Sequence, residues 1–300
     1  MTKQSITPTW DQVKQLKRFA EDAVDRVLKE AALDKNGVQR VIERGGELQA
    51  QIVEIIRGLS LSNQYANEEI SSTYTYPPEY RLHILDVQIK NLAKILGLDP
   101  SQAMKLAYNL PTKPNGAEGW FPIPSVDALA VKYFPEVTDP SEKYCRAVQL
   151  LLDKLAASRS FHNYREGQID PAHLRMTTRT AEAMAQIVAE QPGDILIIPA
   201  QLGMRHRGRS VRRAREVFVG NEFGLSSLMG VSIALTHPER FVRWEELDMD
   251  FSGDEFSTDG VGVFSGAPCL LFHGGKLRFD AIAVSDCSDL FGSASGFIAQ

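Results

Sequence analysis

The sequence predicts an α+β protein whose first two-thirds are helical, including a long N-terminal helical hairpin, and whose last third is rich in strands. Three observations predict this fold class. Apolar residues recur at spacings of three and four through most of the chain up to residue 190. At Asp194 the texture changes to a short continuous apolar run, DILIIP, which is typical of a buried strand. From residue 241 onward apolar and polar residues alternate, with the period of a strand.

Two amphipathic helices open the chain, and we assign the hairpin that they form to residues 1–70. The apolar face of the first helix, over about 8–31, consists of Val13, Leu16, Ala20, Ala23 and Val27. The second helix is expected over about 38–59, with a heptad seam that Gly45 and Gly46 weaken in its middle. Such a seam packs either on the main body or on another subunit, so a homo-oligomer through this hairpin is one expectation.

The rest of the chain, residues 71–300, is expected to form one α+β main domain. Its predicted helices span 81–97, 125–133, 140–158 and 171–190. The proline-rich stretch 109–124 predicts a structured loop that carries Trp120 and Phe121. Two apolar runs flank Gly274 and Gly275, which predicts a β-hairpin.

Composition excludes some classes of function. The formal net charge of -5 and the pI of about 5.8 argue against a uniformly basic nucleic-acid coat protein. The N-terminus has no signal-like apolar segment, and the apolar runs are too short or too broken to cross a membrane. Cys145, Cys269 and Cys287 are scattered and form no CxxC motif, which indicates reduced thiols and a cytoplasmic location.

Positive charge is concentrated in one segment, RHRGRSVRRAR, over residues 205–215. Its six arginines are Arg205, Arg207, Arg209, Arg212, Arg213 and Arg215. Ser210 is a suitable N-cap for a helix that begins at Val211. Because arginine binds phosphate with bidentate geometry, this arginine run predicts a site for nucleic acid or another phosphate-bearing ligand.

An acidic run, EELDMDFSGDEFSTD, follows at residues 245–259 with seven carboxylates and no basic residue. Leu247, Met249 and Phe251 alternate with Asp248 and Asp250, which predicts a half-buried strand. The acidic run can pair with the arginine run, within one molecule or across a subunit interface. Its carboxylates also suit Mg²⁺ or Ca²⁺. The residues expected to hold such an ion are Asp248, Asp250, Asp254 and Glu255.

Three functions therefore remain open. The first is binding of nucleic acid or another phosphate-bearing ligand through the arginine run. The second is metal-assisted phosphoryl transfer or hydrolysis, with the acidic residues on the ion, the arginines on the phosphoryl group and His206 as acid or base. The third is a structural or assembly role, in which the two charged runs pair and the helical hairpin oligomerises. The sequence carries no GxSxG, HExxH, P-loop or GxGxxG motif to decide among them.

Overall fold

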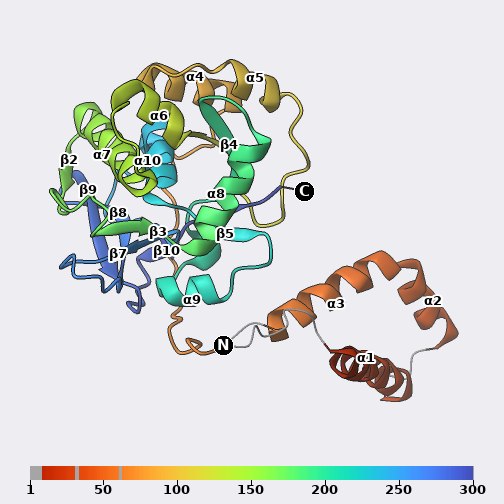
Figure 1. Cartoon of the computed structure of the whole chain (residues 1–300). Coiled ribbons are helices and arrows are strands. Elements are labelled where there is room, and N and C mark those ends of the chain that lie inside the picture. Colours follow the sequence, from red (N-terminus) through yellow and green to blue (C-terminus); the bar gives the residue numbers. More distant parts are fainter. Residues whose placement is uncertain (1–8, 31–33, 61–62, 300) are drawn as a thin grey trace. The chain divides into compact units, whose positions relative to one another are not determined.

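The computed structural model describes residues 9–30, 34–60 and 63–299, and the chain divides into two compact units (Figure 1). We call Met1–Leu61 the helical unit and Ser62–Gln300 the body. Helices are mostly N-terminal and strands mostly C-terminal, which confirms the predicted α+β class. The division falls earlier than the predicted boundary at residue 70, because the residues that follow position 62 bond to the body.

The helical unit contains three helices where the sequence predicted two. They are α1 (Trp10–Glu30), α2 (Lys35–Glu43) and α3 (Gly45–Ser60). The prediction of one unbroken helix over 38–59 is wrong, because Arg44 leaves the helical conformation at φ -100°, ψ 26°. Glycine favours such a break, since its backbone loses the most entropy in a helix. Asp34 caps α2 by accepting a hydrogen bond from the backbone N–H of Gly37.

The body begins with helices and continues with helices between its strands. They are α4 (Leu85–Leu96), α5 (Ser101–Ala107), α6 (Val126–Tyr133), α7 (Pro140–Ser158), α8 (Thr178–Glu190), α9 (Val211–Glu216) and α10 (Ser227–Thr236), with 3₁₀ turns η1 (Met204–His206) and η2 (Pro238–Arg240). Side-chain caps start several of them: Ser125 on α6, Asp139 on α7 and Thr177 on α8. The helix predicted from residue 171 therefore begins later, at Thr178.

A four-stranded antiparallel sheet forms one half of the body. Its strands, in spatial order, are β1 (Gly119–Pro124), β4 (Ile195–Gln201), β11 (Ser295–Phe297) and β5 (Glu222–Gly224). The DILIIP run supplies β4, which is buried along its whole length as predicted. The stretch that was expected to be a loop supplies β1, and its Phe121 is fully buried in the core.

A second sheet of seven strands forms the other half. Its path runs through β10 (Phe291–Ser293), β6 (Asp248–Asp250), β8 (Gly266–His273), β7 (Asp254–Phe256) and β3 (Leu174–Met176), while β9 (Lys276–Ala283) pairs with β8 and with β2 (Phe161–Asn163). β8 and β9 are the predicted hairpin. Gly274 and Gly275 turn the chain there with φ of +62° and +73°, values that favour glycine.

Helix α10 lies at the centre of the body, and all ten of its residues are buried. It packs against α7, β1 and α4. On another side of α10, Gly230 lets the helix approach the second sheet, because a Cβ at that position would overlap the ring of Phe251. Among the residues that the structure describes, no helix combines the length and the apolar character that crossing a membrane requires.

Candidate functional site

The arginine run folds as η1, a short loop and α9. Ser210 caps α9 by accepting a hydrogen bond from the backbone N–H of Arg213, as the sequence predicted. Val211 and Ala214 are fully buried and fasten α9 to the body. The arginine side chains therefore leave α9 and its approach loop at fixed positions.

The main partner of the arginine run is the segment that follows the helical unit, residues 63–72, which we call the strap. Glu68 accepts hydrogen bonds from Arg212 Nε at 2.9 and 2.8 Å, and from the Ser210 hydroxyl at 2.6 Å. Glu69 pairs with Arg213 and, at 3.2 Å, with Arg209 Nε. These are charge-assisted contacts between carboxylates and guanidinium groups, the strongest class of side-chain hydrogen bond.

Backbone contacts hold the strap in the same place. The N–H of Ile70 donates to the Gly208 carbonyl at 2.8 Å, and the N–H of Ser210 donates to the Glu68 carbonyl at 3.1 Å. The guanidinium of Arg212 also lies 4.4 Å from the ring centroid of Tyr65, close enough for a cation–π contact. The strap is thus bound to the arginine run through main chain, carboxylates and an aromatic ring.

His206 and Arg205 meet a second carboxylate inside the body. His206 is buried, and its Nε2 lies 2.7 Å from Glu222 Oε1 while its Nδ1 lies 3.0 Å from Arg209 Nη1. Burial lowers the pKa of His206, although the contact with Glu222 acts in the opposite direction. Arg205 Nε lies 3.4 Å from Glu222 Oε1. The proposed acid or base therefore has both ring nitrogens engaged within the chain.

The other two arginines bind backbone carbonyls. Arg207 Nη1 donates to the Tyr74 carbonyl at 3.1 Å. Arg215 donates to the carbonyls of Ser252 and Asp254 at 2.8 and 2.6 Å. Arg215 thus contacts backbone carbonyls of the acidic run. The carboxylates that pair with the arginine run belong to Glu68, Glu69, Glu216 and Glu222. The expected partner for internal pairing was the acidic run, and the strap largely takes that place.

The acidic run lies inside the second sheet rather than on its surface. The prediction of a half-buried strand is wrong, because Asp248 and Asp250 are buried together with their apolar neighbours. Burial raises the pKa of Asp248 to about 8 and also raises the pKa of Asp250. The Ser293 side chain lowers the pKa of Asp250 in part, but burial has the larger effect. The pair is thus held in an environment that favours its uncharged form.

The two other predicted metal ligands have protein partners. Asp254 accepts hydrogen bonds from the Tyr144 hydroxyl at 2.7 Å and from the Ser227 N–H at 2.6 Å. Glu255 accepts one from Arg175 Nε at 2.8 Å. Over residues 9–30, 34–60 and 63–299, no three His, Cys, Asp or Glu side chains gather into a group that could hold a metal ion.

A buried polar cluster that the sequence did not indicate surrounds Arg240. The Arg240 guanidinium is fully buried and lies 4.1 Å from the ring centroid of Tyr76, whose hydroxyl donates to Glu118 at 2.6 Å. Burial lowers the pKa of nearby His237 to about 4. Arginine is seldom buried as deeply as Arg240, so composition and spacing carry no signal for such a cluster. Its contacts connect the first strand, β1, to the turn after α10.

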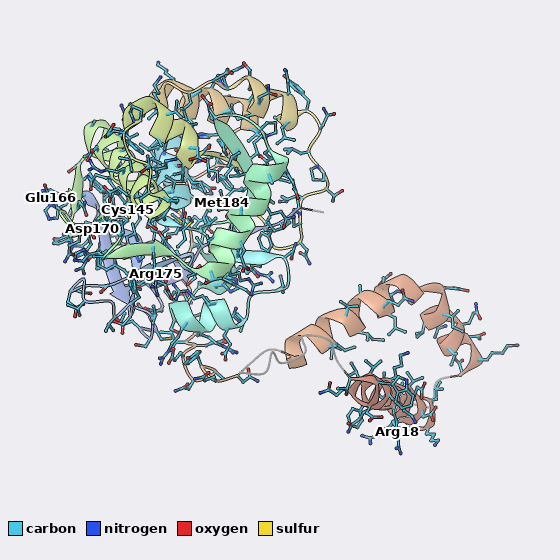
Figure 2. All side chains as sticks on the ribbon, in the orientation of Figure 1. Arg18, Cys145, Glu166, Asp170, Arg175 and Met184 are labelled. Atoms are coloured by element: carbon cyan, nitrogen blue, oxygen red, sulfur yellow. The ribbon has the colours of Figure 1, made fainter. Side chains whose placement is uncertain are left out.

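The helical unit presents a different kind of surface, because its large apolar side chains face solvent. Trp10 is 72% exposed, Phe19 61%, Val24 54% and Ile55 60%. Of the residues whose side chains are described in this unit, Gly37 is the one that is buried. Figure 2 shows the side chain of Arg18 projecting from α1. Among its side chains that the structure describes, the helical unit thus has amphipathic helices without an apolar core.

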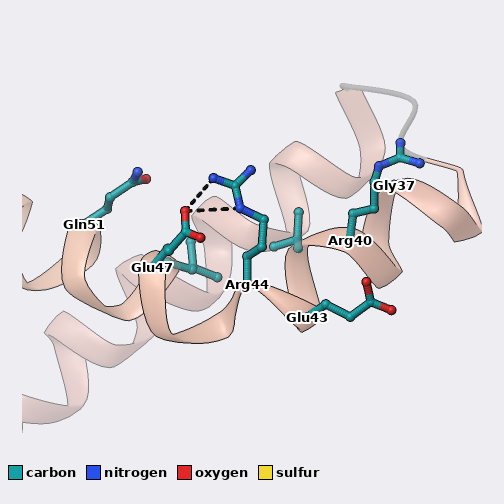
Figure 3. Close-up of a pocket in the computed structure, with 8 residues that line it drawn as sticks. Gly37, Arg40, Glu43, Arg44, Glu47 and Gln51 are labelled. Atoms are coloured by element: carbon teal, nitrogen blue, oxygen red, sulfur yellow. Dashed lines mark hydrogen bonds and ion pairs between the residues drawn. The ribbon is translucent and has the colours of Figure 1, made fainter.

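A groove follows the break between α2 and α3 (Figure 3). Its volume is about 470 Å³, and its apolar lining comes from Gly37, Val41 and Leu48. Gln51 and charged side chains form the rest of the lining, and in one pair Arg44 Nε donates to Glu47 at 3.1 Å. An apolar floor with charged walls is the kind of surface on which an amphipathic helix packs.

Comparison with known proteins provides no family from which to transfer a site. No protein-family model matches the chain, and no curated protein or solved structure is significantly similar to it.

Proposed function

We propose that this chain is an assembly protein, in which the helical unit joins copies of the chain and carries the body into a homo-oligomer. The observation that carries this proposal is the exposure of the apolar faces of α1, α2 and α3. Phe19 on α1, Ile42 on α2 and Ile55 on α3 are each at least 60% exposed. Amphipathic helices of this kind are stable when their apolar faces pack against other helices.

The energetic argument follows from the number of such side chains. Burying one large apolar side chain contributes about 1.5–3 kcal/mol, and the helical unit exposes about a dozen of them. Most of the stability of a helix in a protein comes from packing of its amphipathic face, so α1 gains from a partner that covers this face. Packing several copies into a bundle would supply the missing core.

The arginine run fits this proposal as internal structure. Its guanidinium groups bind the strap, and the strap is the segment that directly follows the helical unit in the chain. A phosphate-bearing ligand would have to displace Glu68 and Glu69 from these groups. The contacts therefore favour an assembly protein with a firmly attached linker over a polyanion-binding protein.

The test compares two substitutions that add the same charge to opposite faces of α1. Val24→Glu lies on the apolar face, and Gln15→Glu lies half a helical turn away on the polar face. We expect light scattering to show an oligomer for the wild type and for Gln15→Glu, and a monomer for Val24→Glu. The thermal unfolding of the body should be the same in all three. A monomeric wild type at every concentration, or equal effects of both substitutions, would contradict the proposal.

A further inference from the structure

The apolar stripe of α1 is arranged symmetrically about Ala20. Val13 and Val27 each lie seven residues from Ala20, and Leu16 and Val24 each lie four residues from it. In an α-helix all four side chains then fall within about 40° of Ala20 around the helix axis. A second copy of α1 that runs in the opposite direction would therefore place Val13 against Val27, and Leu16 against Val24.

The charges of α1 follow the same division. The basic block Lys14, Lys17 and Arg18 precedes Ala20, and the acidic block Glu21, Asp22 and Asp25 follows it. With Asp11, Arg26, Lys29 and Glu30 included, the half of α1 before Ala20 has a net charge of +2 and the half after it has a net charge of -2. Antiparallel pairing places the basic block of one copy beside the acidic block of the other, whereas parallel pairing places like charges together. Exposed charge pairs contribute little energy each, but they select the orientation of a pair of helices.

Two further points favour a second α1 as the partner. One copy of α1 carries the basic and the acidic block in equal number, so a second copy complements both at once. The macrodipoles of two antiparallel helices also attract one another, since the positive end of each lies beside the negative end of the other. The two α1 helices would then be related by a two-fold axis, the commonest symmetry of homo-oligomers.

We propose that two chains pair through antiparallel α1 helices, with Ala20 of each copy at the two-fold axis. This inference rests on the proposed assembly function and adds its partner, its register and its direction. Within the pair, the exposed stripe of one chain covers the exposed stripe of the other.

Single cysteines test the register and direction in the full chain. Cys145 and Cys269 are buried, so a Cys287→Ser background leaves the introduced thiol as the accessible one. Ala20→Cys should give a covalent dimer with a short thiol-to-thiol crosslinker. Val13→Cys should not, because antiparallel pairing separates the two copies of position 13 by about 21 Å along the axis. An equimolar mixture of Val13→Cys and Val27→Cys should crosslink.

Each outcome separates the inference from the proposed function. If the Val13→Cys chain gives as much covalent dimer as the Ala20→Cys chain, the two helices run parallel, and the inference is overturned. An oligomer by light scattering in which none of the three combinations crosslinks would also overturn it, and would move the interface to another surface such as the groove between α2 and α3. A monomeric wild type would overturn both proposals.

Charge reversal provides a second measurement that needs no crosslinker. A chain with Lys14, Lys17 and Arg18 changed to glutamate has an entirely acidic central α1, and a chain with Glu21, Asp22 and Asp25 changed to lysine has a basic one. Arg18 and Asp22 lie about 160° from Ala20 around the axis and pair within their own helix, so the pairs across the interface are Lys14 with Asp25 and Lys17 with Glu21. Each variant should dimerise about tenfold more weakly than the wild type, because these pairs become repulsive. Mixing the two variants should restore pairing as a heterodimer. Failure of the mixture to recover affinity would refute the antiparallel arrangement.

Discussion

The buried aspartates of β6 lead to a quantitative prediction about pH. Asp248 has a pKa of about 8 in the folded chain, and burial raises the pKa of Asp250 as well. A carboxyl whose pKa is raised by folding contributes stability at low pH, and that contribution is lost as the pH rises through the folded pKa. We therefore expect the body to become less stable between pH 6.5 and pH 8, as a buried charge forms in the second sheet.

The range above pH 6.5 isolates this effect. Burial lowers the pKa of His206 and His237 from the ordinary value of 6.5. These two residues therefore make the free energy of unfolding rise with pH, and they do so mainly below pH 6.5. One proton held by the folded state changes the free energy of unfolding by about 1.4 kcal/mol per pH unit. Asp248 alone should thus remove about 2 kcal/mol over this range.

Urea unfolding measured at several pH values tests this prediction. The fluorescence of Trp120 and Trp244 reports on the body once Trp10→Phe removes the tryptophan of the helical unit. The substitution Asp248→Asn should flatten the pH dependence, while Asp259→Asn, at an exposed position, should leave it unchanged. A wild-type stability that is constant or rises from pH 6.5 to 8, or an unaltered slope in Asp248→Asn, would refute the reasoning.

Two substitutions test the packing of the body by urea unfolding. Glu69→Gln should cost about 2 kcal/mol and speed hydrogen exchange in the strap, because it removes two arginine partners, whereas Glu79→Gln in a half-exposed pair should cost less than about 1 kcal/mol. Gly230→Ala should cost about 3 kcal/mol because its Cβ overlaps Phe251, and Gly220→Ala, which meets no atom within 4 Å, should cost little. Equal effects within either pair would contradict these contacts.

Local signals in the sequence were sufficient for several elements. The predicted helix 140–158 has the same bounds as α7, because Asp139 caps it and Pro140 suits its first turn. The isoleucine-rich run became β4, and the Gly274-Gly275 pair became the turn of the β8–β9 hairpin. Each of these features depends on neighbours within a few residues, which is the range over which propensity and capping act.

Elements that depend on distant partners were not predictable in the same way. β1 lies in a proline-rich stretch that looks like a loop, and it becomes a strand by pairing with β4 about seventy residues later. β3 has three residues, and its partner β7 lies in the acidic run. For such short strands, the pairing partner decides the structure more than the residues of the strand do.

The candidate site shows the same dependence. The arginine run was predicted to pair with the acidic run that follows it, yet Arg212 pairs with Glu68, which is 144 residues away. Charge composition favours the acidic run, which holds seven carboxylates, over the strap, which holds two. The fold selects the strap by placing the aspartates of β6 inside a sheet, where their environment favours the uncharged form.

In the helical unit, by contrast, local spacing in the sequence was sufficient to predict a helix. The spacing of Val13, Leu16, Ala20 and Val27 predicted an amphipathic helix, and α1 forms as one unbroken helix from Trp10 to Glu30. What spacing could not tell is whether the other helices of the helical unit cover this face. Within that unit the apolar side chains of α1 stay exposed, and the proposed pairing gives a role to the symmetry of its apolar and charged residues about Ala20. A stripe that matches its own reverse suits a two-fold axis, and a second copy of the chain supplies one.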